Sequence, residues 1–194
     1  QRQMCIRDSL TSCCPSWAML AKKYFPDMID EVSQELTPMV ATARTIKKEH
    51  PNAKVVFIGP CIAKRKEAQR DECVDYVMTF EELHPLFKGL GIELEQANPY
   101  KEAYESVCEA HGFAQAGGVA GAVKAYLGPK ADGIKMLQFS DFNKKNIGVL
   151  RAYAKTGKVD AQFIEMMACE GGCVTGPSAH NDPVAGRRQL NQDL

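Results

Sequence analysis

The stretch FIEMMACEGGCVTGP, residues 163–177, decides the fold. Its first five residues form a short apolar run, which predicts a strand over residues 163–167. Cys169 and Cys173 follow that strand and flank a Gly-Gly pair. Because glycine permits a sharp turn and a close approach of the backbone to a bulky group, both thiols can face one object at the end of the strand.

Two further cysteine motifs stand where helices are expected to begin. In TSCCPSW, residues 11–17, Cys14 directly precedes Pro15, a residue that favours the first position of a helix. A thiol at a helix N-terminus meets the positive end of the helix dipole, which favours the thiolate that binds metal. Adjacent cysteines do not easily bind the same ion, so Cys13 is free for another role.

The remaining motif is FIGPCIAKRKE, residues 57–67, in which Cys61 lies between a predicted strand and a predicted helix. The ends of strands are where α/β folds place their ligands. Lys64 follows one turn later, and its cation can hold an anionic group of a cofactor. The three motifs therefore collect candidate ligands and one cation at the ends of regular elements.

Four thiolates suit either a [4Fe–4S] cluster or a Cys₄ zinc site. The four candidate ligands are Cys14, Cys61, Cys169 and Cys173. Zinc sites usually use two short C-x₂₋₄-C knuckles, whereas two of these cysteines come singly from distant helix starts. This dispersion favours a cluster buried inside the fold, with a zinc-stabilised α/β module as an alternative.

Composition limits the classes of function. The chain has 194 residues, 45% of them apolar, and eight cysteines, which favours metal binding over the disulfide framework of a small secreted domain. Lys plus Arg and Asp plus Glu number 24 each, so no basic field predicts binding to nucleic acid or to a membrane. The first residues lack the apolar run of a signal peptide, and we expect a cytoplasmic protein.

Helix and strand patterns alternate along the chain, which predicts an α/β domain with partly parallel sheets flanked by helices. We expect strands over 54–58, 74–78, 134–139 and 163–167, and helices over 16–24, from 37–38 onward, and over 62–70, 79–89, 98–112, 117–126 and 142–155. The segment 178–194 has little periodicity and is expected to be a loose tail. No linker divides the chain, so 1–194 is expected to be a single domain.

The three motifs, in this order, resemble the signature motifs of the [FeFe]-hydrogenase (iron-only hydrogenase) catalytic domain. The family patterns are T-S-C-C-P-x-W, P-C-x-x-K-x-x-E and E-x-M-A-C-x-x-G-C, and this chain matches all three. The resemblance implies the family's fold, with a cofactor bound between two lobes. It also implies the family's activity, the reversible reaction of 2 H⁺ and 2 e⁻ to H₂.

The family's cofactor is the H-cluster, a [4Fe–4S] cubane joined through a cysteine sulfur to a two-iron subsite with CO, cyanide and an azadithiolate bridge. The resemblance implies that the four candidate ligands hold the cubane and that Cys173 also bridges to the subsite. Cys13 would pass protons, and Lys64 would hydrogen-bond a cyanide. Met167 would pack beside the subsite, and Pro60 would also contact the cofactor. The implied partners are H₂, protons and a ferredoxin or other electron carrier.

Departures from the pattern keep a second class of function open. Gly59 stands where many members have Met, and the third motif ends in Val-Thr-Gly-Pro-Ser rather than in glycines followed by Gln-Pro. A sensory or assembly protein with the same fold and a cluster is therefore an alternative, although the retained Cys13 and Lys64 favour catalysis. The family domain extends further at both ends, so we interpret the chain as an inner part of it, and residues 1–9 as a foreign junction.

Overall fold

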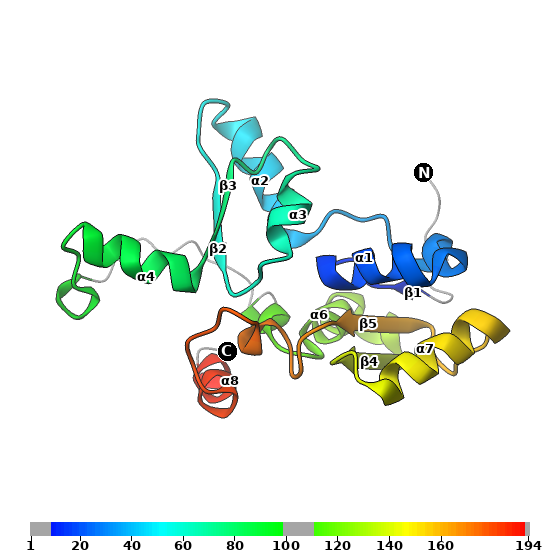
Figure 1. Ribbon diagram of the computed structural model, residues 1–194. Coiled ribbons are helices and arrows are strands. Elements are labelled where there is room, and N and C mark those ends of the chain that lie inside the picture. Colours follow the sequence, from blue (N-terminus) through cyan, green and yellow to red (C-terminus); the bar gives the residue numbers. More distant parts are fainter. Residues whose placement is uncertain (1–8, 99–110, 193–194) are drawn as a thin grey trace.

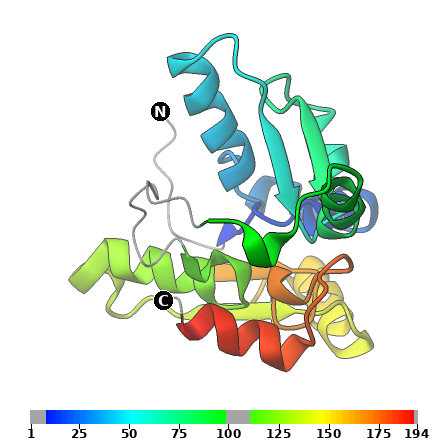
Figure 2. The ribbon, with the colours of Figure 1, turned by 90° about the vertical axis from the view of Figure 1, so that its left-hand side faces the viewer.

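The computed structural model describes residues 9–98 and 111–192, which form two lobes (Figures 1 and 2). The lower lobe contains a three-stranded sheet, and the upper lobe contains a two-stranded sheet. All strand pairs in both sheets are parallel. This confirms the α/β class with short parallel sheets. The helix expected over 98–112 and the residues Cys5 and Cys108 lie outside the described residues.

The lower lobe is built on strands β1 (Ser9–Leu10), β5 (Phe163–Met167) and β4 (Met136–Ser140), in that order across the sheet. Helices α1 (Pro15–Tyr24) and α7 (Lys144–Thr156) cover one face. Their buried residues Trp17 and Leu150 share a core with Ile164 of β5. Side chains alternate across a strand, so the neighbouring Glu165 points to the other face, where helix α6 (Gly118–Leu127) lies.

The upper lobe pairs β2 (Val56–Gly59) with β3 (Tyr76–Thr79). Helices α2 (Pro38–Glu49), α3 (Lys64–Ala68) and α4 (Phe80–Gly89) surround this sheet. Met39, Val40 and Ala43 of α2 supply most of its small buried core. The predicted capping box is present, because Thr79 and Glu82 exchange hydrogen bonds at the start of α4.

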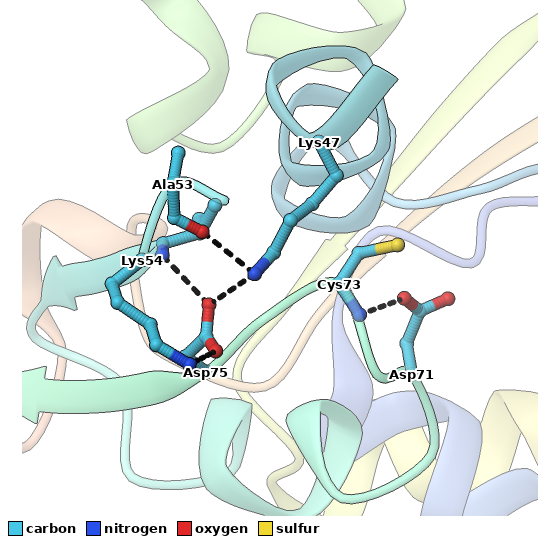
Figure 3. A network of polar contacts seen from close by, with 7 residues as sticks. Lys47, Ala53, Lys54, Asp71, Cys73 and Asp75 are labelled. Atoms are coloured by element: carbon cyan, nitrogen blue, oxygen red, sulfur yellow. Dashed lines mark hydrogen bonds and ion pairs between the residues drawn. The ribbon is translucent and has the colours of Figure 1, made fainter. Parts of the chain in front are cut away.

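Asp75 ties α2 to the start of the upper sheet (Figure 3). Its carboxylate pairs with Lys47 at 2.7 Å and with Lys54 at 3.1 Å, and it accepts a hydrogen bond from the amide of Val55 at 2.8 Å. These donors, the bond from Lys47 above all, hold the pKa of Asp75 well below its usual value. The network therefore fixes the helix against both strands.

Short 3₁₀ turns connect the main elements: η1 (Pro26–Glu31), η2 (Leu94–Gln96), η3 (Gly112–Ala114), η4 (Gly128–Ala131) and η5 (Cys173–Thr175). None of the helices in residues 9–98 and 111–192 has the length and apolar character needed to cross a membrane.

Two expectations about the ends of the domain require correction. The segment 178–194, expected to be loose, contains helix α8 (Pro183–Gln192), which begins at an aspartate that accepts hydrogen bonds from the amides of Val184 and Ala185. Gly186 of that helix packs against Val174. At the other end Ser9, assigned to a foreign junction, pairs with Phe163 in the sheet and thus belongs to the domain.

Candidate metal centre

The four candidate ligand cysteines lie at element boundaries. Cys14 is the residue before α1, where its backbone is extended and its side chain makes no capping hydrogen bond, so the thiol is available to a ligand. Cys61 follows β2, Cys169 follows β5, and Cys173 opens η5. Cys14 is buried and the other three are partly buried. These positions agree with the strand and helix ends expected from the sequence.

The thiols of the three motifs lie close enough to influence one another. Burial raises the pKa of Cys173 to about 12, and the charges of Cys14, Cys169 and Cys61 add to the rise. Burial also raises the pKa of Cys169 to about 11, with contributions from Cys14 and Cys61. The structure therefore brings together cysteines from three motifs that lie far apart in the chain. Each thiolate makes the next harder to form, and a bound cation relieves that repulsion.

The loop after Cys173 is packed against the second motif. The amide of Ser178 donates to the carbonyl of Pro60 at 3.2 Å, and the amide of Gly176 donates to the carbonyl of Cys173 at 2.8 Å. A β-carbon added at Gly176 would lie 2.8 Å from the oxygen of Pro60. This contact requires glycine and joins the upper lobe to the lower one beside Cys61.

The Gly-Gly pair of the third motif is held from the other side. Gly172 has φ +104°, a conformation that favours glycine, and an added β-carbon would lie 2.5 Å from the backbone nitrogen of Ala116. The amide of Ala116 donates to the carbonyl of Gly171 at 3.0 Å. The loop that carries Cys169 and Cys173 is thus fixed between two parts of the chain.

Lys64 is a buried cation at the start of α3. Its ammonium lies 2.8 Å from Oε2 of Glu67, and the hydroxyl of Thr37 donates to the other oxygen of that carboxylate. Burial raises the pKa of Cys13, and the positive charge of Lys64 partly opposes that rise, so the first and second motifs lie near each other here. An ammonium group has three N–H donors, and Glu67 accepts one of them.

The departure at Gly59 has a physical cause. A β-carbon at this position would lie 2.9 Å from a ring carbon of Phe57. The same ring lies 5.8 Å below the ammonium of Lys64, within range of a cation–π contact. The aromatic ring thus fills the space beside Gly59 and contacts the cation.

Cys13 lies near polar groups of the first and third motifs. Its thiol donates weakly to the hydroxyl oxygen of Thr11 at 3.8 Å, and that oxygen accepts from the amide of Met166 at 3.0 Å. Burial is the largest cause that raises the pKa of Cys13, and the negative charges of Cys14 and Glu165 act in the same direction. The Thr11 hydroxyl lowers this pKa, because it can donate a hydrogen bond to the thiolate once the proton has left. The thiol therefore keeps its proton at neutral pH.

Sequence reasoning gave Glu165 no role beyond its place in the motif. Glu165 is only 1% exposed, and its carboxylate accepts hydrogen bonds from the amides of Gly117 at 2.7 Å and Ala120 at 2.8 Å. It therefore caps the N-terminus of α6, where a negative charge is stabilised by the helix dipole. The sequence did contain a signal for this role, because Glu165 is an acidic residue within an otherwise apolar strand and a buried carboxylate needs hydrogen-bond donors.

The other predicted site residues lie beside the cysteines. Met167 is buried at the end of β5, two residues before Cys169, and Pro60 is partly buried next to Cys61. Among the described residues, no three His, Cys, Asp or Glu side chains are grouped so as to hold a single metal ion.

Comparison with known proteins identifies the family of the chain. Residues 7–177 match the family described as iron only hydrogenase large subunit, C-terminal domain. The chain is 26% identical to iron hydrogenase 1 of Clostridium pasteurianum over 86% of its own length and 37% of that protein. It is 29% identical to the periplasmic [Fe] hydrogenase large subunit of Nitratidesulfovibrio vulgaris, over 86% and 50% respectively. The chain therefore spans half or less of these curated relatives.

A second group of relatives has a different name. The chain is 31% identical to the cytosolic Fe-S cluster assembly factor NAR1 of Kluyveromyces lactis over 50% of its length and 21% of that protein. Among solved structures, an [FeFe]-hydrogenase HydA1 variant from Chlamydomonas reinhardtii superposes with a TM-score of 0.68 at 21% identity, covering 96% of this chain and 65% of that one. That likeness shows the fold. Since the family match extends over most of the chain, the protein belongs to the iron-only hydrogenase large-subunit family, and its residues 7–177 match the C-terminal domain of that family.

Proposed function

We propose that this chain carries out the reversible conversion of 2 H⁺ and 2 e⁻ to H₂ at an H-cluster. The observation that carries the proposal is the convergence of all three motifs: the thiols of Cys14, Cys61, Cys169 and Cys173 influence one another, with Cys13 and Lys64 beside them. The match to the iron-only hydrogenase family supports it. Residues 1–194 would act as one domain, because both lobes contribute to this site.

The four cysteines would hold a [4Fe–4S] cluster, and Cys173 would also bridge to the two-iron subsite. When bound, the cofactor supplies the metal chemistry and stores the electrons, and the protein supplies binding, orientation and electrostatics. The burial of Cys14 and of Met167 would keep water from the cofactor. Pro60 would contribute to the wall beside Cys61.

Lys64 would donate a charge-assisted hydrogen bond to a cyanide of the subsite. Its ammonium has three donors, and Glu67 at 2.8 Å accounts for one of them. The Glu67 carboxylate offsets the cost of burying the cation and fixes its position. The side chain is therefore oriented before the cofactor is bound.

Cys13 would move protons between the cofactor and the protein. Its thiol carries a proton at neutral pH and lies 3.8 Å from the hydroxyl of Thr11, a group that can both donate and accept. The nearby positive charge of Lys64 limits the rise in its pKa. A thiol that can give up and regain a proton suits a relay.

We also infer a cytoplasmic location and a ferredoxin or similar carrier as the electron partner. The described cysteines Cys13, Cys14, Cys61, Cys73, Cys169 and Cys173 are all free thiols, which suits a reducing compartment. Hydrogen evolution driven by reduced ferredoxin, compared with evolution driven by a small viologen dye, tests the choice of carrier.

A non-catalytic role in iron–sulfur assembly or sensing is the second candidate. The 31% identity to the assembly factor of Kluyveromyces lactis favours it. In that case the chain would bind the cubane and show no turnover with a two-iron subsite supplied. The presence of both Cys13 and Lys64 beside the cysteines favours the catalytic proposal.

The test is hydrogen production by the full chain, reconstituted without oxygen with iron and sulfide and then loaded with a synthetic two-iron mimic. We expect H₂ from reduced viologen with the unchanged chain. Cys13→Ser should keep its iron and lose nearly all turnover, whereas Cys14→Ser should lose iron. A loaded chain without turnover would favour the assembly role. Equal iron loss in both variants would contradict the assignment of Cys14 as an iron ligand and of Cys13 as a proton carrier.

A further inference from the structure

The hydroxyl of Ser178 is buried without a hydrogen-bond partner. Ser178 is 1% exposed, and no described residue accepts from or donates to its Oγ. A buried hydroxyl without a partner destabilises the folded protein, because it has lost its hydrogen bonds to water and gained none in return. Such a group in a folded protein calls for a specific explanation, for example a ligand that completes its hydrogen bonding.

The position of Ser178 points to the cluster site. Its amide donates to the carbonyl of Pro60 at 3.2 Å, and Pro60 is bonded to Cys61. Two residues earlier, Gly176 packs against the same carbonyl and against that of Cys173. Ser178 therefore lies where the loop that follows Cys173 meets the second motif, against the residue that precedes Cys61.

A second buried polar atom provides a contrast. The indole nitrogen of Trp17 also has no partner among the described residues. Its ring, however, packs against Phe25 and Phe142 in the apolar core of the lower lobe. Trp17 is thus surrounded by apolar core residues, whereas the amide of Ser178 bonds the carbonyl of Pro60, the residue before the candidate ligand Cys61.

We propose that the Ser178 hydroxyl donates a hydrogen bond to a sulfur of the [4Fe–4S] cluster or its thiolates, on the side of Cys61. This inference rests on the proposed function, because it requires the cluster. Hydrogen bonds to the sulfurs are among the factors that set the potential of an iron–sulfur cluster. Reduction adds a negative charge, and a donor stabilises that charge, so Ser178 raises the reduction potential.

The test uses the full chain reconstituted with iron and sulfide alone, so it does not depend on hydrogenase activity. The reduced cluster is followed by EPR during a redox titration of the unchanged chain and of Ser178→Ala, Ser178→Gly and Ser33→Ala. Both Ser178 variants should lower the ratio of reduced to oxidised cluster at a fixed potential by about three- to tenfold, a shift of ~30–60 mV for one electron. Ser33→Ala removes a hydroxyl that already accepts the amide of Glu35 and should leave the potential unchanged.

A second measurement separates the hydrogen bond from packing. In the metal-free chain, Ser178→Ala removes an unsatisfied hydroxyl, so its melting temperature should equal or exceed that of the unchanged chain. Unshifted potentials in both Ser178 variants with an intact cluster would overturn the inference and leave the proposed function standing. The inference would also be overturned if the potentials of Ser178→Ala and Ser178→Gly differed from each other by more than either differs from the potential of the unchanged chain. Failure of the unchanged chain to bind a cluster would remove the proposed function itself.

Discussion

The ammonium of Lys64 lies 2.8 Å from the carboxylate of Glu67, and the two side chains are only 11% and 12% exposed. Because both charges are removed from water, each depends on the other. Removing one partner of a buried pair leaves an uncompensated charge and typically costs about 3–5 kcal/mol. The pair therefore fixes the cation of the site and makes the start of α3 sensitive to substitution.

Glu67→Ala should accordingly lower the free energy of unfolding by about 3 kcal/mol, measured by urea denaturation. Glu72→Ala, at an exposed position in the next loop, is the matched control and should change it by less than about 0.5 kcal/mol. Replacing both partners, Lys64→Met with Glu67→Leu, should recover most of the loss. Equal effects of Glu67→Ala and Glu72→Ala would show that the pair does not form.

Glu165→Gln should destabilise the lower lobe by about 2 kcal/mol, because an amide nitrogen cannot accept the second of the two α6 hydrogen bonds. The helix should also lose the favourable interaction of its N-terminus with a negative charge. Thermal unfolding followed by circular dichroism measures the loss. Glu170→Gln, an exposed change of the same type nearby, should have little effect, and similar losses in both variants would argue against the cap.

Gly172→Ala should disrupt the third motif. The residue has φ +104°, and the new β-carbon would lie 2.5–2.6 Å from backbone atoms of Gln115 and Ala116, so the loop must move. Gly133→Ala is the control, because Gly133 also has a positive φ, +83°, but faces open space. We expect a cost of about 1 kcal/mol for Gly133→Ala and about 3 kcal/mol or more for Gly172→Ala. Iron binding should fall in Gly172→Ala alone, and normal binding there would show that the loop tolerates the shift.

Acid should weaken the upper lobe through Asp75. Its pKa in the folded protein lies below the value of 3.8 for an unperturbed aspartate, so it stabilises the fold above pH 3.8 and loses that contribution as pH falls toward the folded pKa. Asp75→Asn should be less stable than the unchanged chain at pH 7, and the difference should shrink as the solution is acidified below about pH 4. Unfolding curves of both proteins from pH 7 to pH 3 measure the difference. A gap that stays constant over this range would contradict the assignment.

Much of the fold could be predicted from short-range signals. The capping box at Thr79, the glycine stop at Gly157 and the apolar strand before Cys169 all act within a few residues, and the structure has α4, α7 and β5 where these signals place them. Strand β1 was missed because its two residues form a strand only by pairing with β5. Helix α8 was missed because its stability depends on packing against η5, which the sequence pattern does not reveal.

The site likewise combines features that neighbouring residues determine with contacts between residues far apart in the chain. The spacing of cysteines, glycines and prolines predicted that each motif places a thiol at the end of an element, and the structure has Cys14, Cys61 and Cys169 at such ends. The supporting contacts join distant positions: Thr11 bonds Met166, and Glu165 bonds Ala120. Such partners leave no periodic pattern in the chain. The buried hydroxyl of Ser178 likewise becomes visible only once the loop is folded.

The most direct test of the central claim is the metal content of the full chain after anaerobic reconstitution with iron and sulfide, together with its EPR spectrum after reduction. The account predicts about four irons per chain and the signal of a reduced [4Fe–4S] cluster, both lost in Cys169→Ala. Bound zinc, an absence of metal from a folded chain, or an iron content unchanged by Cys169→Ala would contradict it.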